Sequence, residues 1–243
     1  MEARINQNSV LIDQLIPDSI IRSQTMRWVV DITIVVVFSL LVALSAQIAF
    51  RIPTTTVPIT GQTFGVLLTG GVLGSKRGAS SLFLYMILGM VGMPVFAPNF
   101  SKVLTDTSFH FILPWNGHSS TIWESSGFLT MTSGGYIIGF ILAAYVVGRL
   151  AEKGWNSKPR ITLALLIGNL LIYVIGLPWL GYIISTNSGI YDYIVGSNVL
   201  DKTLKGGLYP FIGGDAVKLV LAGLALPGVT TLVRRLKFDD TND

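Results

Sequence analysis

The sequence predicts an all-α, polytopic membrane protein with six transmembrane helices and both termini in the cytoplasm. Three observations predict it. Of the 243 residues, 51% are hydrophobic and only 12% are charged, whereas about 25% are charged in an ordinary soluble domain. The mean hydropathy is +0.63. Runs of about 20 apolar residues, the length that crosses a bilayer as a helix, recur along the chain. Too few polar residues remain to cover a soluble globule, which excludes a soluble enzyme, a disordered chain and a nucleic-acid binder.

Six segments are long and apolar enough, or nearly so, to cross the hydrocarbon. They are residues 28–50, 60–74, 78–97, 134–150, 161–184 and 213–236. The second is rich in glycine and too short for a perpendicular crossing unless residues 57–59 extend it. Because backbone inside lipid must satisfy its own hydrogen bonds, we expect all six to be helices.

The distribution of Lys and Arg predicts the orientation. An even number of spans puts both ends of the chain on one side, together with twelve basic residues: Arg4, Arg22, Arg27, Lys76, Arg77, Arg149, Lys153, Lys158, Arg160, Arg234, Arg235 and Lys237. Only Arg51, Lys102, Lys202 and Lys205 fall on the other side. Since basic residues concentrate in cytoplasmic loops, the first side is assigned to the cytoplasm of a multi-pass cell-membrane protein.

The expected organisation is a leader, one membrane domain and a short tail. Residues 1–27 lack the pattern of a signal peptide and form either an interfacial helix or a flexible leader. Residues 28–237 form a single six-helix domain, and residues 238–243 a cytoplasmic tail. Residues 98–133 form an external insertion with both histidines, His110 and His118. A solvated insertion is favoured over a lid or a metal-binding loop, because two histidines eight apart without a third ligand are a weak metal signal.

Small residues recur at helical spacing and predict close helix packing. In the second segment they are Gly61, Gly65, Gly70, Gly74 and Gly78. In the first segment Ser39 and Ala43 form one stripe, and Ser45 and Ala49 another. Small residues let helices approach closely in lipid. These two stripes therefore dock a partner subunit or pack inside the protein, and the sequence does not separate the alternatives.

Four polar clusters interrupt the apolar segments, and polar groups in lipid are candidates for function. Thr60 and Gln62 follow two prolines that break a helix, so they border either a cavity or a plain external loop. Gly135 and Tyr136 open the fourth segment, where exposed N–H groups can meet a ligand. Tyr136 could instead be an interfacial anchor.

The other two clusters lie deeper. Asn169 and Tyr173 are four residues apart and share a helical face, so the Asn amide suits either a ligand with a urea or amide edge or an interhelical hydrogen bond. Asp215 is expected at a helix N-cap with Lys218 one turn further. That pair either neutralises itself or shares a ligand carboxylate with the positive end of the helix. The outer halves of the spans thus have the composition of an outward-opening small-molecule pocket.

Motifs for catalysis are missing from the sequence. It has no G-x-S-x-G, no H-E-x-x-H and no paired carboxylates on one helix, and its cysteine count of zero excludes thiolate chemistry. We therefore expect no catalytic residues, no metal ligands and no cofactor. Without a Walker A motif, this chain cannot power transport by ATP hydrolysis alone.

Four stretches resemble the BioY family of biotin-specific substrate-binding subunits, the S components of energy-coupling-factor (ECF) transporters. They are VPITGQTFGVLLTGGVLGSKRGASSLFLYMILGMVGMPVF, SGGYIIGFILAAYVVGRLAE, GNLLIYVIGLPWL and PFIGGDAVKLVLA, in order and correctly spaced from about Ala43 to Leu226. The resemblance implies an ECF S-component-like fold that binds biotin from outside. It also implies a membrane coupling (T) subunit and two ATPase subunits as partners, with no nucleic acid.

The resemblance also implies roles for individual residues. The GGDxxK pattern maps to Asp215 and Lys218, GNxxIY to Asn169 and Tyr173, and GGY to Tyr136, as polar or stacking contacts of biotin. The stripes in the first segment resemble the face that docks the coupling subunit. The chain departs from the family in having Thr132-Ser133 before Gly134-Gly135-Tyr136 and a longer external loop, in which Lys102 is the one basic candidate.

The function expected from the sequence is capture of biotin for ATP-driven uptake, and not an enzymatic reaction. Three alternatives stay open. The chain could bind another small carboxylate-bearing vitamin, be an integral-membrane enzyme of cofactor metabolism that uses Asp215 and Lys218, or be a structural subunit of a membrane assembly.

Overall fold

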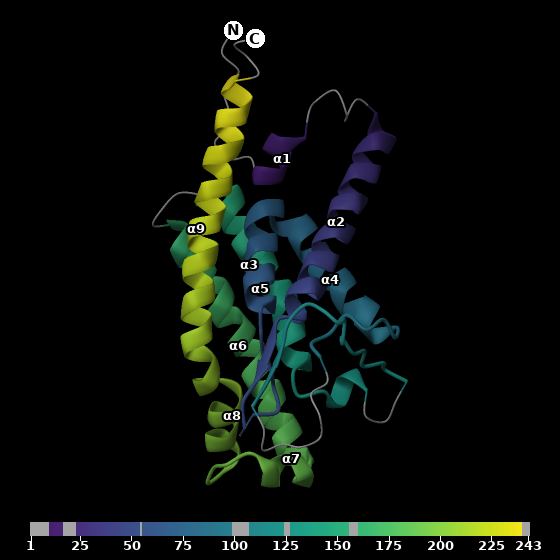
Figure 1. Cartoon of the computed structure of the whole chain (residues 1–243), viewed down its shortest axis with the longest axis vertical. Helices are drawn as coiled ribbons and strands as arrows, with labels where there is room; N and C mark the ends of the chain where they lie inside the picture. The colour runs from purple at the N-terminus through teal and green to yellow at the C-terminus, as the bar shows by residue number, and fades with distance from the viewer. Residues whose placement is uncertain are drawn as a thin grey trace.

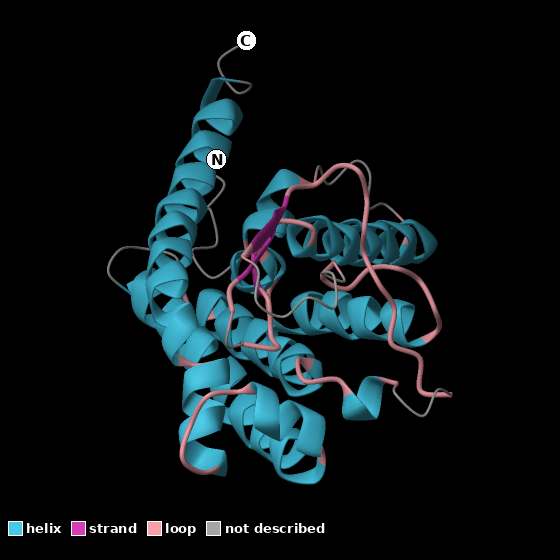
Figure 2. Cartoon of the chain, turned by 60° about the horizontal axis from the view of Figure 1, so that its bottom comes forward, coloured by secondary structure: helices cyan, strands magenta, loops and turns pink. Residues whose placement is uncertain are grey.

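The computed structural model describes residues 10–16, 23–53, 55–98, 107–123, 127–155 and 160–239. Within these ranges it is a bundle of helices, most of them roughly aligned, with a small sheet beside them (Figures 1 and 2). Four segments are long and apolar enough to cross a membrane. They are α2 (Gln24–Ala46), α5 (Gly134–Glu152), α6 (Arg160–Thr186) and Val199–Gly228, which joins α8 (Val199–Gly207) to the first part of α9 (Tyr209–Asp239).

Two shorter helices occupy the positions of the second and third predicted spans. They are α3 (Gln62–Leu73) and α4 (Ser75–Met90). At about 1.5 Å per residue they are about 18 and 24 Å long, less than the roughly 30 Å of a hydrocarbon core. Both pack against the central α5, which also packs along α6. The third span was predicted to reach residue 97, but the helix ends at Met90, because the chain turns at Gly92 (φ +107°) and Pro94.

A three-stranded antiparallel sheet at the C-terminal end of α2 is a correction to the all-α prediction. Its order is β2 (Ile59–Thr60), β1 (Ala49–Arg51), β3 (Ser108–His110). The first predicted span, 28–50, therefore ends as a helix at Ala46, and its last residues enter β1. Strands of two or three residues are too short to show an alternation of apolar and polar residues in the sequence. They form because segments far apart in the chain pair with one another. Two short helices lie in connecting segments: η1 (Phe128–Thr130) before α5, and α7 (Ser188–Tyr193) after α6.

The described part of the leader is docked on the bundle. It contains α1 (Leu11–Leu15), and Leu11 is buried in an apolar cluster with Leu67 and Leu165. Arg77 of α4 forms ion pairs with Asp13 of α1 (2.5 Å) and with Asp31 of α2 (2.8 Å). This favours the helical alternative for residues 11–15. Residues 1–9, 17–22 and 240–243 of the predicted leader and tail lie outside the described residues.

Three of the four residues predicted to form docking stripes are buried in the structure, and the fourth, Ser45, is partly buried. Ser39, Ala43 and Ala49 are at most 1% exposed. Ser45 meets α3 so closely that a Cβ added at Gly65 would lie 2.6 Å from its Oγ. Close approach between α2 and α3 explains the small side chain of Ser45, as the internal-packing alternative predicted. Docking of a partner at these residues stays a prediction.

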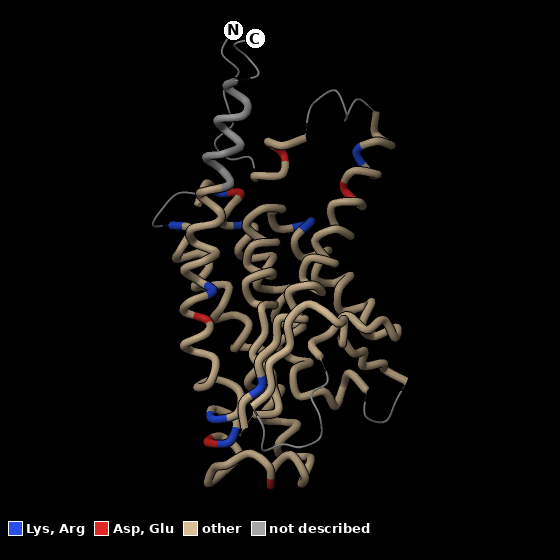
Figure 3. The backbone as a smooth tube through the Cα atoms, viewed as in Figure 1, with Lys and Arg blue, Asp and Glu red and all other residues tan. Residues whose placement is uncertain are grey.

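The exposed face of α2 is apolar. It carries large side chains that include Val29, Ile32, Val36, Val37, Leu40 and Leu44. Charged residues gather toward the two ends of the molecule, and the band between them is nearly free of charge (Figure 3). This division is the one expected of a protein whose exposed apolar side chains face lipid.

Candidate binding site

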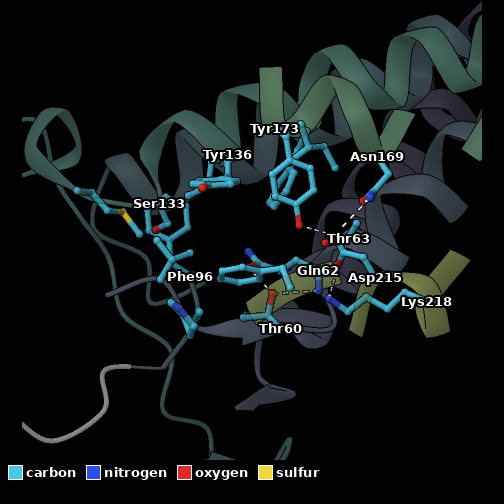
Figure 4. A pocket seen from close by; sticks show the side chains of 18 residues that line it. Thr60, Gln62, Thr63, Phe96, Ser133, Tyr136, Asn169, Tyr173, Asp215 and Lys218 are labelled. Carbon is cyan, nitrogen blue, oxygen red and sulfur yellow. Dashed lines mark hydrogen bonds and ion pairs between the residues drawn. The ribbon is translucent and has the colours of Figure 1, made fainter. Parts of the chain in front are cut away.

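The candidate site is a cavity between α3, α5, α6 and α9, closed on one side by the residues before α3 and before α5 (Figure 4). It contains about 560 Å³ of empty space, part of it open to solvent. Its lining is mostly apolar and aromatic, with a few polar groups on one wall. The lining residues are Val57, Pro58, Thr60, Gln62, Thr63, Phe96, Ala97, Met131, Ser133, Tyr136, Ile137, Phe140, Asn169, Ile172, Tyr173, Phe211, Asp215 and Lys218.

The carboxylate of Asp215 is the centre of the polar wall. Lys218 Nζ lies 3.0 Å from Asp215 Oδ1, and the hydroxyl of Tyr173 donates to Oδ2 at 2.5 Å. The amide Nδ2 of Asn169 donates to the same Oδ2 at 3.3 Å. Asp215 is only 4% exposed. A buried carboxylate needs such donors and a positive partner to remain charged, so α6 and α9 are tied together at this point.

Two groups in this cluster keep unused hydrogen-bonding capacity. Among the described residues, Asp215 is the only partner of the Lys218 ammonium, which has three donors. The side-chain carbonyl Oδ1 of Asn169 is buried and has no partner within the described chain. A buried acceptor without a partner is costly. The wall therefore offers donors and an acceptor to a ligand that brings the complementary groups.

Lys202 shows what a fully satisfied buried ammonium looks like in this molecule. Its Nζ donates to the backbone oxygens of Tyr191 (2.7 Å) and Ile194 (2.6 Å) and lies 4.2 Å from the centre of the Tyr191 ring. Lys202 therefore holds α8 to the segment after α7. Lys218 has no such set of backbone oxygens and borders open space.

Tyrosine and glutamine side chains form the rest of the lining. The Tyr136 hydroxyl donates to the backbone oxygen of Gly207 at 2.9 Å, which turns the ring face to the cavity, and its ring is edge-on to Tyr173. Gln62 is held by its Nε2, which donates to Tyr85 (2.6 Å), and by its Oε1, which accepts from Thr60 (2.8 Å). These contacts fix the side chains in place before any ligand arrives.

Two expectations about glycines and helix ends are corrected. Gly135 does not line the cavity. It allows α5 to approach α6, since an added Cβ would collide with Trp179. Asp215 is not an N-cap, because α9 begins six residues earlier, at Tyr209. The positive end of α9 therefore does not reach Lys218, and the charge at the site comes from side chains alone.

Sequence reasoning missed the aromatic half of the lining. Phe96, Phe140 and Phe211 face the polar wall from three different segments, together with Met131. The sequence does not show whether an apolar residue of a membrane segment faces a cavity, the lipid or the protein core. The only available signal was the position of Phe96 and Phe211 inside the motifs MVGMPVF and PFIGGD.

The two histidines of the external insertion are engaged with backbone. His110 Nδ1 lies 2.7 Å from the oxygen of Gln47 and its Nε2 lies 2.8 Å from that of Pro114. His118 Nδ1 contacts the oxygen of Ala97, and burial lowers the His118 pKa, while that contact raises it less. Within the described ranges no three histidine or acidic side chains gather in a way that could hold a metal ion. Lys102 lies outside the described residues.

Comparison with known families gives a match along nearly the whole chain. The model of the BioY family matches residues 18–119 and 120–235. A biotin transporter BioY of Thermotoga maritima is 31% identical over 192 residues, which cover 77% of this chain and 88% of that protein. A probable biotin transporter BioY of Pyrococcus horikoshii is 33% identical over 192 residues, 79% and 91% of the two chains.

A solved structure has the same fold. The chain is similar to a crystal structure described as the S-component for biotin from an ECF-type ABC transporter. The TM-score is 0.61 with 21% identity, over 86% of this chain and 94% of that one.

Proposed function

Because the chain belongs to the BioY family, we propose that it is the biotin-binding S component of an ECF-type vitamin importer, a multi-pass membrane protein and not an enzyme. The observation that carries the proposal is the Asp215 cluster on the wall of the cavity. It presents a lysine with unused donors and an asparagine with an unused acceptor beside aromatic side chains. Such a site suits a small molecule with an apolar body and a few polar groups.

The chemistry of biotin fits this wall through its ureido ring. That ring carries two N–H donors and one strongly accepting carbonyl oxygen. An N–H would meet Asn169 Oδ1, and the carbonyl oxygen would accept from Lys218. Because the Lys218 charge is already balanced by Asp215 at 3.0 Å, a neutral acceptor suits it better than a further carboxylate. The alternative is that Lys218 contacts the ligand carboxylate. It has less support, because α9 begins at Tyr209 and its positive end does not reach Lys218.

We further propose six crossings with both termini in the cytoplasm. The six helices α2, α3, α4, α5, α6 and α9 support the number, with α3 and α4 as shortened crossings. The start of α2 and the end of α9 lie at the same end of the bundle (Figure 1). Arg77 and Arg149 line one hollow with Asp31, near the start of α2, and basic residues are enriched at the cytoplasmic ends of membrane helices. A membrane coupling subunit and two ATPases would supply the energy, since this chain has no nucleotide-binding motif.

Equilibrium binding of isotope-labelled biotin to the detergent-purified protein tests the function. Mass analysis of the recovered ligand distinguishes the alternatives. Intact biotin bound with saturation supports an S component. A chemically altered ligand would indicate an enzyme, and no binding would indicate a structural subunit. Competition by other carboxylate-bearing vitamins at equal concentration would point to a different cargo.

A further inference from the structure

The described part of the external insertion, residues 107–123, turns large apolar side chains to the exterior. Leu113 is 77% exposed and Trp123 is 78% exposed. Phe109, Phe111, Trp115 and Ile122 are exposed as well. Clusters of exposed aromatic and aliphatic side chains on a loop indicate an apolar partner and not bulk water.

The same stretch is free of charge. Residues 107–123 contain no Asp, Glu, Lys or Arg, and their titratable side chains are His110 and His118. A loop that projects into water normally carries polar and charged residues. In Figure 3 the described loop beside α2 and α4 carries no charged positions, in contrast to the two ends of the molecule.

The exposed rings continue the apolar surface of α2. Strand β3 pairs with β1 so that Phe109 lies opposite Phe50, and the rings of Phe109 and Phe111 stack with centres 6.4 Å apart. Phe50 and Ile48 are both 37% exposed, directly after α2. One surface therefore runs from the lipid-facing side of α2 through the sheet to the insertion.

The polar groups of the insertion are turned inward. The Trp115 indole donates to the oxygen of Pro94 (2.9 Å), and the backbone N–H of Asn116 donates to Oε1 of Gln47 (3.3 Å). The Ser120 amide donates to the oxygen of Gly89 at the end of α4 (3.2 Å). These bonds fix the loop against the ends of α2 and α4. Irregular backbone does not fit the hydrocarbon core, but the headgroup boundary accepts it and favours aromatic side chains.

We propose that the external insertion is an interfacial anchor that rests in the outer leaflet of the membrane, with Phe109, Phe111 and Leu113 at the headgroup boundary. It fills the space beside α4, which ends about 6 Å short of a full crossing by its length. Since the bridge between Phe96 and His118 joins the insertion to the lining of the cavity, the anchor would hold one wall of the site at a fixed depth.

The natural lack of cysteine allows a direct test. The variant Phe111→Cys, labelled with an environment-sensitive fluorophore, is reconstituted in vesicles of phosphatidylcholine and phosphatidylglycerol. Quenching by a lipid with a nitroxide near its headgroup is compared with quenching by aqueous iodide. Val37→Cys on the exposed face of α2 is the lipid reference, and Ser188→Cys at the exposed start of α7 is the water reference. Leu113→Cys is a second probe, and retained biotin binding checks the fold of each variant.

The expected result is a ratio of nitroxide to iodide quenching at residue 111 within about threefold of that at residue 37 and at least tenfold above that at residue 188. A ratio closer to that at residue 188 overturns the proposal. Protection from both quenchers also overturns it, because another protein chain would then cover the surface.

Discussion

Replacing Lys218 tests both the site and the end of biotin that it contacts. Lys218→Ala removes the one cation paired with Asp215, and its side chain is only 13% exposed. A hydrogen bond from a charged donor contributes about 1.5–3 kcal/mol. At about 1.4 kcal/mol per factor of ten, the Kd for biotin should rise about 10- to 150-fold. Equilibrium binding in detergent measures it.

Two controls separate the loss of a ligand contact from general damage. Lys205→Ala removes a lysine that pairs with Asp201 on the surface of α8 and does not line the cavity, so its Kd should stay within about twofold of the parent. In the double variant Lys218→Ala, Asp215→Asn no unpaired buried carboxylate remains. It should bind biotin as weakly as Lys218→Ala if the contact itself was lost.

A double-mutant-type cycle, which combines Lys218→Ala with a modified ligand, identifies the part of biotin that Lys218 contacts. Biotin amide keeps the ureido ring and lacks the carboxylate. If Lys218 meets the ring, Lys218→Ala weakens biotin and biotin amide by the same factor, because independent contacts add. A much smaller factor for the amide would place the carboxylate at Lys218 and refute the ureido assignment. An unchanged Kd for biotin in Lys218→Ala would remove this residue from the site.

Three further predictions concern packing and the external insertion. Ala43→Leu should lower the free energy of unfolding by about 1–3 kcal/mol because Ala43 is buried. Val37→Leu, on the exposed face of α2, should leave the free energy of unfolding unchanged. If Ala43→Leu folds, binds biotin and fails only in uptake, the result would support docking of a partner at this stripe. Gly176→Ala should weaken biotin binding, since its Cβ would lie 2.5 Å from the Tyr136 ring; unchanged affinity would show that the ring yields freely. Burial lowers the His118 pKa, so the folded insertion loses stability as pH falls below about 6.5, the ordinary value. Protection factors of the amides of residues 107–121, which correct hydrogen exchange for its intrinsic pH dependence, should then be lower at pH 5.5 than at pH 7.5, but not in His118→Gln.

The sequence predicted most of the helical architecture, because hydropathy directly reports which segments lipid can surround. Six expected segments became six helices, and α5 and α6 match their expected ranges within two residues. The helix ends that were predicted wrongly are those that tertiary contacts determine. Residues 91–97 are apolar enough to span, but the turn at Gly92 and the bridge from Phe96 to His118 take them out of the helix.

The polar residues of the cavity could be predicted from the sequence, but the hydrogen bonds between them could not. Asn169, Tyr173, Asp215 and Lys218 stand out because ionisable and amide groups are rare in lipid-embedded helices. The sequence does not say that Asp215 accepts from all three of the others. That arrangement depends on how α6 and α9 face each other, which spacing within one helix does not fix.

Small residues in a membrane helix allow close packing either within the chain or against a partner subunit. A stripe such as Ser39 and Ala43 lets any helix approach, whether from the same chain or from a partner. In this chain Gly61 and Gly65, at the start of α3, lie against Ser45 of the other stripe. The close contact brings Thr60 and Gln62, which precede and begin α3, to the cavity. The small side chain of Ser45 therefore affects the binding site indirectly, because it allows the start of α3, which carries Thr60 and Gln62 to the cavity, to lie close to α2.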